Sequence, residues 1–402
     1  MRIIEFSDSF YPIMDGVGNV VFQYATHLGR KGHECYVVAP QTDTGWRGGW
    51  PFEMVDYIGV PLPTLKSYNA GAPLLDAHCT RRLGMIKADI VHVHSPFMAG
   101  QAGLAYAKRN NLPVVGTFHS KYYDDFLQVT GVELLAEVGT RAVVDFYNRC
   151  DEVWAVSASS AETLRSYGYL GQVRVMTNGT DIPPRQPGAA EAAAERWGLG
   201  ESRILLFVGQ MNWKKNLRCV LEAAAKIEGD VRLVLAGQGP HEQEIRALGA
   251  ELGLGERLVM TGHLTDRALL NGLFDRADLF VFPSVYDNAP MVLREAAAMG
   301  TPGVVVRGSS AAEGITDGEN GFLCENDPAD LARVIAAALA DPARLQQVGE
   351  QAKATIPIPW DKLLDQVVAR YGELIQNRRA VAQAVPDPED SVRRGGYQHS
   401  AP

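Results

Sequence analysis

The stretch Ile204–Asn216, ILLFVGQMNWKKN, decides the fold. Its first five residues are apolar without a break, which is typical of a strand that a parallel sheet buries on both faces. Polar turn residues follow, and a helical pattern begins after them. A second apolar run, LFVF at Leu279–Phe282, leads into a turn and a helical pattern in the same way. Strand, turn and helix in this order predict an α/β architecture with doubly wound parallel sheets.

The alternation extends over the rest of the chain and breaks at NGTDIPPRQPG (residues 178–188), where Gly, Pro and Asp gather as in a connector. We therefore expect two Rossmann-like domains, at residues 1–180 and 181–356. Ligands of such sheets bind beyond the carboxyl ends of the strands, so the expected site is a cleft between the two domains. The expected strands are Ile3–Phe6, Cys35–Ala39, Ile90–His94, Val114–Phe118, Glu152–Val156, Val173–Met176, Ile204–Val208, Arg232–Ala236, Leu258–Thr261, Leu279–Phe282 and Gly303–Val306.

Two prolines, Pro357 and Pro359, end the helical pattern of the second domain, and an amphipathic helix is expected at Trp360–Ile375. The tail at residues 384–402 is polar and rich in Pro and Gly, which predicts disorder.

Composition narrows the function classes. The 402 residues carry a net charge of −9, whereas a general nucleic-acid-binding protein would be basic. The five cysteines lack CxxC or metal-ligand spacing, which favours free thiols in a reducing compartment. The amino terminus lacks a signal-peptide pattern, and no apolar stretch reaches the roughly 20 residues of a spanning helix. We expect a cytoplasmic protein, and peripheral contact with the inner face of the membrane stays open.

A glycine turn, DGVGN, follows the first strand and carries Gly16, Gly18 and Asn19. Its amides, with the dipole of the following helix, would suit an anion. The alternative is a tight turn that merely needs glycine. Val21 stands where a dinucleotide-binding fingerprint would have its third glycine, which argues against a dehydrogenase.

A lysine pair follows the strand at Ile204–Val208, in the turn Gly209–Asn216. Lys215 at this strand-to-helix turn would neutralise a phosphate. The alternative is a solvated pair of lysines, the usual fate of such charges.

The stretch SVYDNAPMVLREA follows the strand at Leu279–Phe282. Pro290 fits the first turn of a helix, and Asp287 or Asn288 would cap it. Glu295 would lie about two helical turns beyond Asp287 if the helix were continuous. Paired carboxylates suit ligands rich in hydroxyl groups, and the alternative is a capping Asp with an ordinary Glu.

Histidines end two strands of the first half. His119, in GTFHSK, is placed where a ligand would meet the sheet, and it would contact a sugar hydroxyl or act as acid or base. A histidine bonded only to the backbone is the alternative. For His92 and His94, in VHVH, the structural interpretation is favoured over a catalytic one.

These motifs, taken in order, resemble the retaining glycosyltransferases of family 4, which have the two-domain GT-B fold. The resemblance spans nearly the whole chain, from Met1 to about Ile375. Each motif is weak and the ordered set is strong. The motifs are Pro12–Gly18, HVHSP, GTFHS, VWAVS, TNGTD, VGQ with KKN, AGQGP, TGHL and FPSVYDNAPMVLREAAAMGTP.

The resemblance implies a role for each matching position. Glu295 would hold the ribose hydroxyls of the nucleotide, Lys215 the diphosphate, and Asp287 the hydroxyls of the transferred sugar. His119 would contact that sugar near the reacting carbon, AGQGP and TGHL would lie beside the base, and the helix at about 360–376 would cross back to the first domain. The implied catalytic residues are His119, Lys215 and Asp287; the implied substrate-binding residues are Gly16, Gly18, Asn19, Gln210, Asn288, Ala289, Pro290, Met291, Val292 and Glu295.

Three positions depart from the family pattern. Gln210 stands where Arg is usual, so one charge on the leaving diphosphate is missing, and Lys214 is a candidate substitute. Asp287 replaces the usual Glu. Pro290 replaces a common Gly and cannot donate a backbone hydrogen bond.

The expected activity is transfer of a hexose from a nucleotide diphosphate sugar to a hydroxyl acceptor, with retention and without a metal or other cofactor. UDP is the expected nucleotide and glucose the default sugar. The acceptor, a lipid or a glycan or small molecule, would bind around Trp46–Ala72 and Lys121–Arg141. The aromatic residues of that first segment would form an exposed patch or simply pack a long loop. The alternative functions are a nucleotide-sugar epimerase or phosphorylase and a non-catalytic nucleotide-sugar-binding protein.

Overall fold

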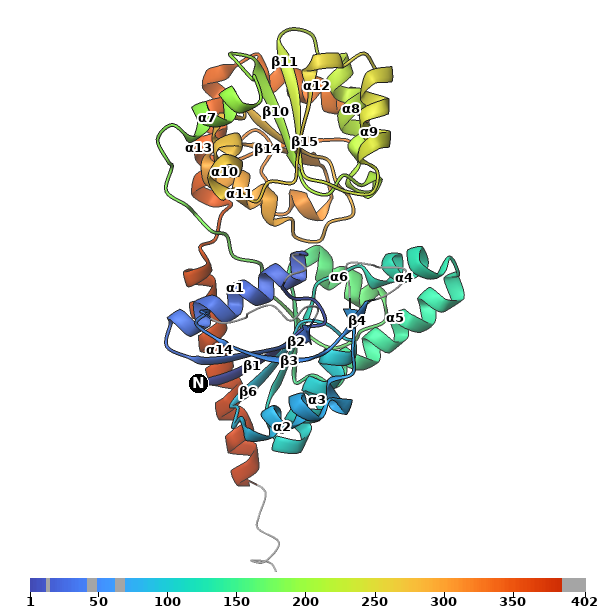
Figure 1. Ribbon diagram of the computed structural model, residues 1–402, viewed down its shortest axis with the longest axis vertical. Helices are drawn as coiled ribbons and strands as arrows, with labels where there is room; N and C mark the ends of the chain where they lie inside the picture. The colour runs from blue at the N-terminus through green and yellow to red at the C-terminus, as the bar shows by residue number, and fades with distance from the viewer. Residues whose placement is uncertain (12–14, 42–48, 62–68, 385–402) are drawn as a thin grey trace, which may run out of the picture. The chain divides into compact units, whose positions relative to one another are not determined.

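The computed structural model describes residues 1–11, 15–41, 49–61 and 69–384. The predicted tail therefore lies outside the described residues, apart from Ala384, and so do Trp46 and parts of the expected acceptor segment. The described chain forms two parallel-sheet α/β domains, as the alternation predicts (Figure 1).

The first sheet has seven strands in the order β3-β2-β1-β6-β7-β8-β9. Neighbouring pairs from β3 to β7 run parallel. Strand β1 lies beside β6, and the strand order reverses between them, which makes a topological switch point at their carboxyl ends. The strands are β1 (Arg2–Phe6), β2 (Glu34–Gln41), β3 (Glu53–Ile58), β6 (Ile90–Val93), β7 (Val114–Phe118), β8 (Glu152–Ala155) and β9 (Val173–Val175), and a separate antiparallel pair is β4 (Val60–Pro61) and β5 (Asn69–Ala70).

The second sheet has six strands in the order β12-β11-β10-β13-β14-β15, and all its pairs are parallel. Its switch point lies between β10 and β13, the two apolar runs that predict the architecture. The strands are β10 (Arg203–Val208), β11 (Val231–Ala236), β12 (Leu258–Gly262), β13 (Leu279–Phe282), β14 (Gly303–Val306) and β15 (Phe322–Cys324).

Helices connect the strands of both sheets (Figure 1). The α-helices are α1 (Gly16–Arg30), α2 (Ala77–Met85), α3 (Met98–Asn110), α4 (Tyr122–Thr130), α5 (Glu133–Tyr147), α6 (Ala158–Ser166), α7 (Ala189–Arg196), α8 (Leu217–Lys226), α9 (Glu242–Glu251), α10 (Arg267–Arg276), α11 (Met291–Met299), α12 (Pro328–Leu339), α13 (Pro342–Thr355) and α14 (Trp360–Ala384). Short 3₁₀ helices are η1 (Pro73–Leu75), η2 (Trp213–Lys215), η3 (Gly255–Arg257) and η4 (Ser310–Ala312).

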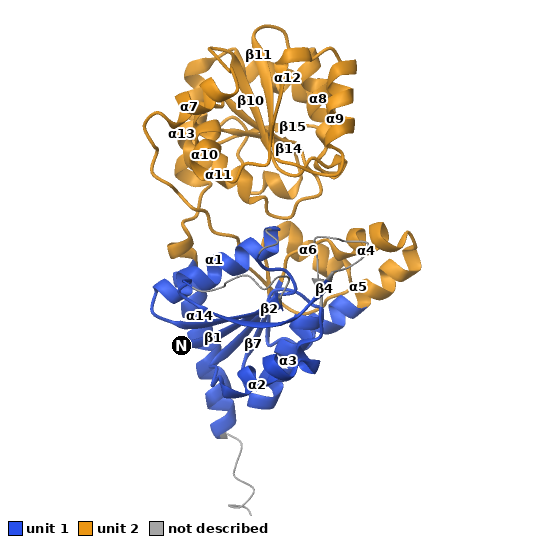
Figure 2. Cartoon of the chain, in the orientation of Figure 1, with its two compact units in different colours: residues 1–117, 142–153, 364–402 blue, residues 118–141, 154–363 orange. Residues whose placement is uncertain are grey.

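Contacts between Cα atoms divide the chain into two compact units (Figure 2). Unit 1 comprises residues 1–117, 142–153 and 364–402, and unit 2 comprises residues 118–141 and 154–363. Helix α14 begins at Trp360, directly after the two prolines, and from Leu364 onward it belongs to unit 1. The helix is longer than predicted, because it continues past Ile375 to Ala384.

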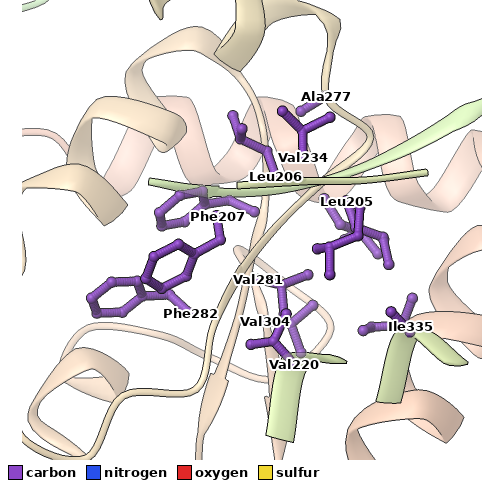
Figure 3. Close-up of a cluster of buried hydrophobic side chains, with 14 of the residues drawn as sticks. Leu205, Leu206, Phe207, Val220, Val234, Ala277, Val281, Phe282, Val304 and Ile335 are labelled. Atoms are coloured by element: carbon purple, nitrogen blue, oxygen red, sulfur yellow. The ribbon is translucent and has the colours of Figure 1, made fainter. Parts of the chain in front are cut away.

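Aliphatic and aromatic side chains together fill the core around the second switch point (Figure 3). Phe207 of β10 stacks on Phe282 of β13, with ring centroids 5.7 Å apart, and Phe282 stacks on Phe280 at the same spacing. Such pairs contribute about 0.5–1.5 kcal/mol each beyond the burial of their area. All three side chains are buried, which confirms the prediction that these strands are covered on both faces. The core thus fixes β10 beside β13.

The aromatic residues Trp50 and Phe52, in the expected acceptor segment, pack against other rings of unit 1. Their two rings stack 5.2 Å apart, and both lie edge-on to Phe22 of α1 at 5.8 Å. Phe10 makes the same kind of contact with both, at 6.2 Å. Among the described residues of the segment, packing of a loop is therefore the alternative that the structure favours.

A buried polar network connects β1, β6, β7 and α14 in unit 1. Glu5 of β1 accepts from His94 Nε2 at 2.6 Å and lies 3.3 Å from His92 Nδ1. His92 Nε2 lies 2.7 Å from Thr117 Oγ1, and the Tyr371 hydroxyl of α14 lies 2.6 Å from His92 Nδ1. Both histidines are buried, so their predicted structural role is confirmed.

This network predicts loss of stability in acid. Burial, then the nearby His94, lowers the pKa of His92 from 6.5 to about 4. Burial alone would raise the pKa of Glu5, but His92 and His94 outweigh it and lower the pKa to about 2. The unfolded chain takes up these protons at higher pH than the folded protein, so stability falls as pH drops from 6.5 towards 4, and again from about 4.5 towards 2.

The measurement is the melting temperature of the parent and of His92→Gln between pH 7.5 and 4.5. We expect a smaller fall with pH in His92→Gln, even if that variant is less stable at pH 7.5. The exposed His78, changed to Gln, is the matched control and should keep the slope of the parent. Equal slopes in the parent and in His92→Gln would contradict the role given to His92.

Candidate functional site

Two loops meet at the switch point of the second sheet. The first follows β10 and contains Gly209–Asn216, with the 3₁₀ helix η2 inside it. The second follows β13 and contains Pro283–Pro290, which leads into α11. Because β10 and β13 are neighbours, the two loops begin side by side. This is where a doubly wound sheet is expected to bind its ligand.

Asn216 fastens the first loop to the second. It adopts a left-handed backbone conformation, with φ of 60°, at the end of η2. Its side-chain amide donates to the Pro283 carbonyl at 3.0 Å and to Asn326 Oδ1 at 2.8 Å. At the other end of η2, the Asn212 side chain accepts from the Lys214 amide at 3.1 Å. These contacts fix the turn from which Lys214 and Lys215 project.

Asn216 therefore gives a prediction for stability. Asn216→Gly keeps the left-handed backbone and loses two hydrogen bonds, so we expect about 1–2 kcal/mol of destabilisation. Asn216→Ala loses the same hydrogen bonds but keeps a Cβ in the left-handed region, without the polar side chain that lets asparagine tolerate it, which costs about 1 kcal/mol more than glycine. Denaturant unfolding of both variants checks this order, and an alanine variant as stable as the glycine variant would contradict it.

Lys215 and Asp287 form an ion pair across the two loops. The other carboxylate oxygen of Asp287 accepts from the Ser284 hydroxyl at 2.5 Å. Each charged side chain is 18% exposed, so the pair is largely buried yet still open to solvent. The sequence predicts both residues as site residues, and the structure places them in contact. The arrangement offers a cation for a phosphate beside a carboxylate for hydroxyl groups.

The predicted start of the helix after β13 is wrong. Helix α11 begins at Met291, and Pro290 is its N-cap residue rather than part of its first turn. Neither Asp287 nor Asn288 caps the helix. The Asp287 carboxylate binds Lys215 and Ser284, and the Asn288 side-chain amide donates to the backbone carbonyl of His119. Glu295 is thus the fifth residue of α11, and the segment from Asp287 to Glu295 is not continuous helix.

His119 lies next to this loop within unit 2. Its backbone carbonyl accepts from the Asn288 amide at 2.7 Å, and its side chain is half-buried. Asn288 itself is buried, and its Oδ1 has no hydrogen-bond partner among the described residues. The predicted residues His119 and Asn288 are therefore brought together.

Glu295 lies further along α11, where it accepts from Arg267 Nη2 at 3.0 Å. Its side chain is 18% exposed, whereas the Arg267 side chain is 53% exposed. Arg267 opens α10, directly after the TGHL motif. The carboxylate is thus held near the surface rather than in the core. The remaining predicted residues of this loop, Ala289, Pro290, Met291 and Val292, are all half-buried, and Gln210 is exposed.

The glycine turn of unit 1 is already capped by its own chain. Asp15 is the N-cap of α1, and its carboxylate accepts from the Gly18 amide at 2.7 Å, while its carbonyl accepts from the Asn19 amide at 3.0 Å. These two amides therefore have partners inside the turn. Gly16 is exposed, and a Cβ there would meet no atom within 4 Å among the described residues.

Sequence reasoning missed Tyr286 as a site residue. Its hydroxyl donates to the Asp125 carboxylate of α4, and its ring lies beside both lysine ammonium groups. Burial raises the pKa of Asp125 above its usual range, although Tyr286 and Lys214 act in the opposite direction. An aromatic residue directly before a predicted sugar-binding carboxylate was the signal that could have marked Tyr286. Its partner α4 lies far away in sequence and gives no such signal.

Within the described parts of the chain, one group of side chains comes close enough to hold a metal ion. It is the buried network of Glu5, His92 and His94, whose ligand atoms lie within 4.8 Å of one another. Those atoms already bond to one another, to Thr117 and to Tyr371, so we interpret the group as a hydrogen-bonded network. In the same residues, no helix is long and apolar enough to cross a membrane.

Comparison with known proteins identifies the family. Residues 14–182 match the model of Glycosyltransferase Family 4, and residues 190–355 match that of Glycosyl transferases group 1. A D-inositol 3-phosphate glycosyltransferase of Mycolicibacterium vanbaalenii is 30% identical over 379 residues, which cover 87% of this chain and 79% of that protein. A GDP-mannose-dependent alpha-mannosyltransferase of Corynebacterium glutamicum is 26% identical over 397 residues, which cover 96% of this chain and 91% of that protein.

Solved structures confirm the architecture. The sucrose-phosphate synthase of Thermosynechococcus elongatus superposes with a TM-score of 0.78 at 20% identity, covering 94% of this chain and 100% of that one. Anabaena HepE in complex with UDP and glucose superposes with a TM-score of 0.74 at 18% identity, covering 92% of this chain and 99% of that one. At these identities the likeness shows the GT-B fold alone. The family models and the sequence relatives show that the chain belongs to glycosyltransferase family 4 and is a glycosyltransferase.

Proposed function

We propose that the chain transfers a mannosyl residue from GDP-mannose to a hydroxyl acceptor, with retention of configuration. The observation that carries the proposal is the Lys215–Asp287 pair at the switch point of the second sheet. The choice of donor is supported by relatives over 96% of the chain, at 25–26% identity, that are named GDP-mannose-dependent alpha-mannosyltransferases. No relative named above favours the epimerase or the non-catalytic alternative.

The chemistry we propose uses groups of this chain alone, without a metal or other cofactor. As the bond between the sugar and the diphosphate breaks, the leaving oxygen keeps the electron pair and gains negative charge. Lys215 neutralises that charge, which is electrostatic catalysis in a partly dry site. The acceptor oxygen bonds to the same face of an oxocarbenium-like sugar, and its proton passes to the departing phosphate. Asp287 releases Lys215 and accepts hydrogen bonds from the hydroxyl groups of the sugar. Glu295 accepts hydrogen bonds from the ribose hydroxyls.

Retention follows from the proposed donor and product. GDP-mannose carries an α-linked mannose, so an alpha-mannosyltransferase that makes an α product keeps the configuration. UDP-glucose, the donor expected from the sequence, belongs in the same experiment because UDP and glucose occupy a structural neighbour. A cytoplasmic location is part of the proposal and is supported by five free thiols, of which four are buried.

The acceptor we propose has an apolar part, as a lipid-linked hydroxyl would. Helix α4, the turn that follows it and the first part of α5 lie in the expected acceptor segment, Lys121–Arg141. They leave apolar side chains exposed, which suit an apolar ligand or a membrane surface better than a free sugar. The exposed apolar residues are Val129, Val132, Leu134, Leu135 and Val138.

The experiment is a thermal-shift screen with GDP-mannose, UDP-glucose and further nucleotide sugars, followed by an acceptor screen with the donor that stabilises most. Water-soluble glycosides and the same glycosides on an alkyl chain form matched acceptor pairs. We expect GDP-mannose to stabilise most and the alkyl member to be the better acceptor, and the product should keep the α configuration by NMR. Stabilisation by none of the donors, or a product of inverted configuration, would contradict the proposal.

A further inference from the structure

Among the residues assigned to the diphosphate, Lys215 is the one that carries a positive charge. A departing nucleoside diphosphate gains charge on its outer phosphate as the glycosidic bond breaks, and fixed cations stabilise that charge. Gln210 is the first side chain after Gly209 in the loop that follows β10, and it is exposed and neutral. Gln210 therefore adds no positive charge to that of Lys215 on this loop. A second cation would have to come from another position.

Lys214 is placed to be that cation. Its amide is held by the Asn212 side chain at 3.1 Å, and it precedes Lys215 in η2. Its ammonium lies 4.4 Å from the centre of the Tyr286 ring, and the ammonium of Lys215 lies 5.9 Å from the same centre. Both ammonium groups thus lie within cation–π distance of one aromatic ring.

Tyr286 is itself fixed in place. Its hydroxyl donates to the Asp125 carboxylate, and Lys121 Nζ donates to the carbonyl of the preceding residue, Val285, at 3.0 Å. Burial, then the Asp125 carboxylate, raises the pKa of Tyr286 well above its usual range, so the ring stays neutral. Asp287, the partner of Lys215, is the next residue along the chain. The ring is therefore a rigid support beside the ion pair.

The present partner of Lys214 is a weak one. Lys214 Nζ lies 3.9 Å from Asp125 Oδ1, and the two side chains are 28% and 40% exposed. Ion pairs of this length and exposure contribute little to stability. A diphosphate would compete with this carboxylate easily. The flexible four-carbon stem lets the ammonium turn from Asp125 towards a phosphate while it stays over the ring.

We propose that Lys214 binds the diphosphate of the donor as its second cation, in place of a basic residue at position 210, and that Tyr286 is its positioning residue. The inference rests on the proposed function. When the bond from the sugar to the diphosphate breaks, the electron pair stays on the outer phosphate oxygen. Lys214 and Lys215 then share the neutralisation of that charge. The other role open to Lys214 is to hold Asp125, which leaves the diphosphate without a second cation.

The test compares Lys214→Met, Gln210→Arg and the double variant, with the exposed Lys226 changed to Met as the matched control. Calorimetry gives the affinities for GDP and GMP and, in parallel, for UDP and UMP. A charge-assisted hydrogen bond contributes about 1.5–3 kcal/mol, so we expect Lys214→Met to weaken binding of the diphosphate about tenfold or more. Binding of the monophosphate should stay unchanged. In the double variant, the arginine that replaces Gln210 should restore the diphosphate affinity, and Lys226→Met should match the parent.

Two results would overturn the inference. Lys214→Met would keep the parent's preference for the diphosphate over the monophosphate, or Gln210→Arg would fail to restore a preference that had been lost. A lysine that merely holds Asp125 would change the affinities for both nucleotides together, and arginine at position 210 would not correct this. If the parent does not prefer GDP to GMP or UDP to UMP, the proposed function itself fails, and the inference fails with it.

A second pair of variants tests Tyr286. Tyr286→Phe keeps the ring and loses the hydroxyl that binds Asp125, whereas Tyr286→Leu loses the ring. If the ring positions Lys214, the phenylalanine variant keeps most of the preference for the diphosphate, and the leucine variant loses as much as Lys214→Met. Combined with Lys214→Met, the leucine substitution should then have little further effect. Full additivity of the two, or an unchanged preference in Tyr286→Leu, would contradict the positioning role.

Discussion

Replacing Lys215 by methionine is expected to lower kcat by a factor of about 10²–10³ and to change the KM of the donor far less. The side chain keeps its length and loses the charge. That charge matters most when the leaving diphosphate becomes more negative, so its loss falls mainly on the transition state. The measurement is steady-state kinetics with the donor that stabilises the parent most, because thermal stabilisation establishes the donor independently of turnover.

Two controls separate catalysis from folding. The ion pair with Asp287 is largely buried, so Lys215→Met leaves a carboxylate without its partner and lowers the melting temperature. Lys215→Arg keeps the pair and should recover part of kcat, and the exposed Lys353, changed to methionine, should match the parent in both kinetics and stability. A Lys215→Met variant with unchanged kcat, or one whose defect is only a raised KM, would contradict the role of Lys215 in the leaving-group step.

Replacing Glu295 by glutamine is expected to weaken nucleotide binding about 10- to 100-fold, because hydrogen bonds from hydroxyls to an ionised carboxylate contribute about 1.5–3 kcal/mol. The loss should appear in the affinities for GDP and GMP equally, since both carry the ribose. This pattern differs from that of Lys214→Met, which should affect only the diphosphate. Calorimetric titration of each variant with both nucleotides distinguishes the two effects.

A nucleotide that lacks the 2′-hydroxyl of the ribose gives a more specific test of this prediction. The parent should bind 2′-deoxy-GDP more weakly than GDP, and Glu295→Gln should bind the two about equally. Arg267→Met, which removes the partner of Glu295, should fall between the parent and Glu295→Gln because the carboxylate stays but is less well oriented. Persistent discrimination between GDP and 2′-deoxy-GDP in Glu295→Gln would show that another residue holds the ribose.

The sequence was sufficient to predict the architecture and most strands, because those strands are continuous apolar runs that polar turn residues follow. It did not predict β3, where EMVDYI mixes acidic and apolar residues, or the short strand β15, Phe322–Cys324. Helix α14 also extends beyond its predicted end, since no helix-breaking residue follows Ile375 until Pro386. Strands β3 and β15 form by pairing with a neighbouring strand, which their own sequence does not reveal. Helix α14 continues because no helix-breaking residue ends it.

The sequence named Lys215, Asp287, His119 and Asn288 as site residues, but it could not predict the contacts between them. Lys215 and Asp287 are 72 residues apart, and their pairing depends on β10 lying beside β13, which the order of the strands in sequence does not reveal. The capping role of Asp287 failed for a related reason: Lys215 and Ser284 bind the carboxylate that would otherwise cap α11. The position of Tyr286 beside both lysines likewise comes from tertiary structure.

The most direct test of the central claim is a crystal structure of the protein with GDP, or with UDP if that nucleotide stabilises it more. We expect the diphosphate at the carboxyl ends of β10 and β13, with Lys215 Nζ about 3 Å from a phosphate oxygen and the Glu295 carboxylate on the ribose hydroxyls. A nucleotide bound elsewhere, with the Lys215–Asp287 pair intact and Glu295 still on Arg267, would contradict it.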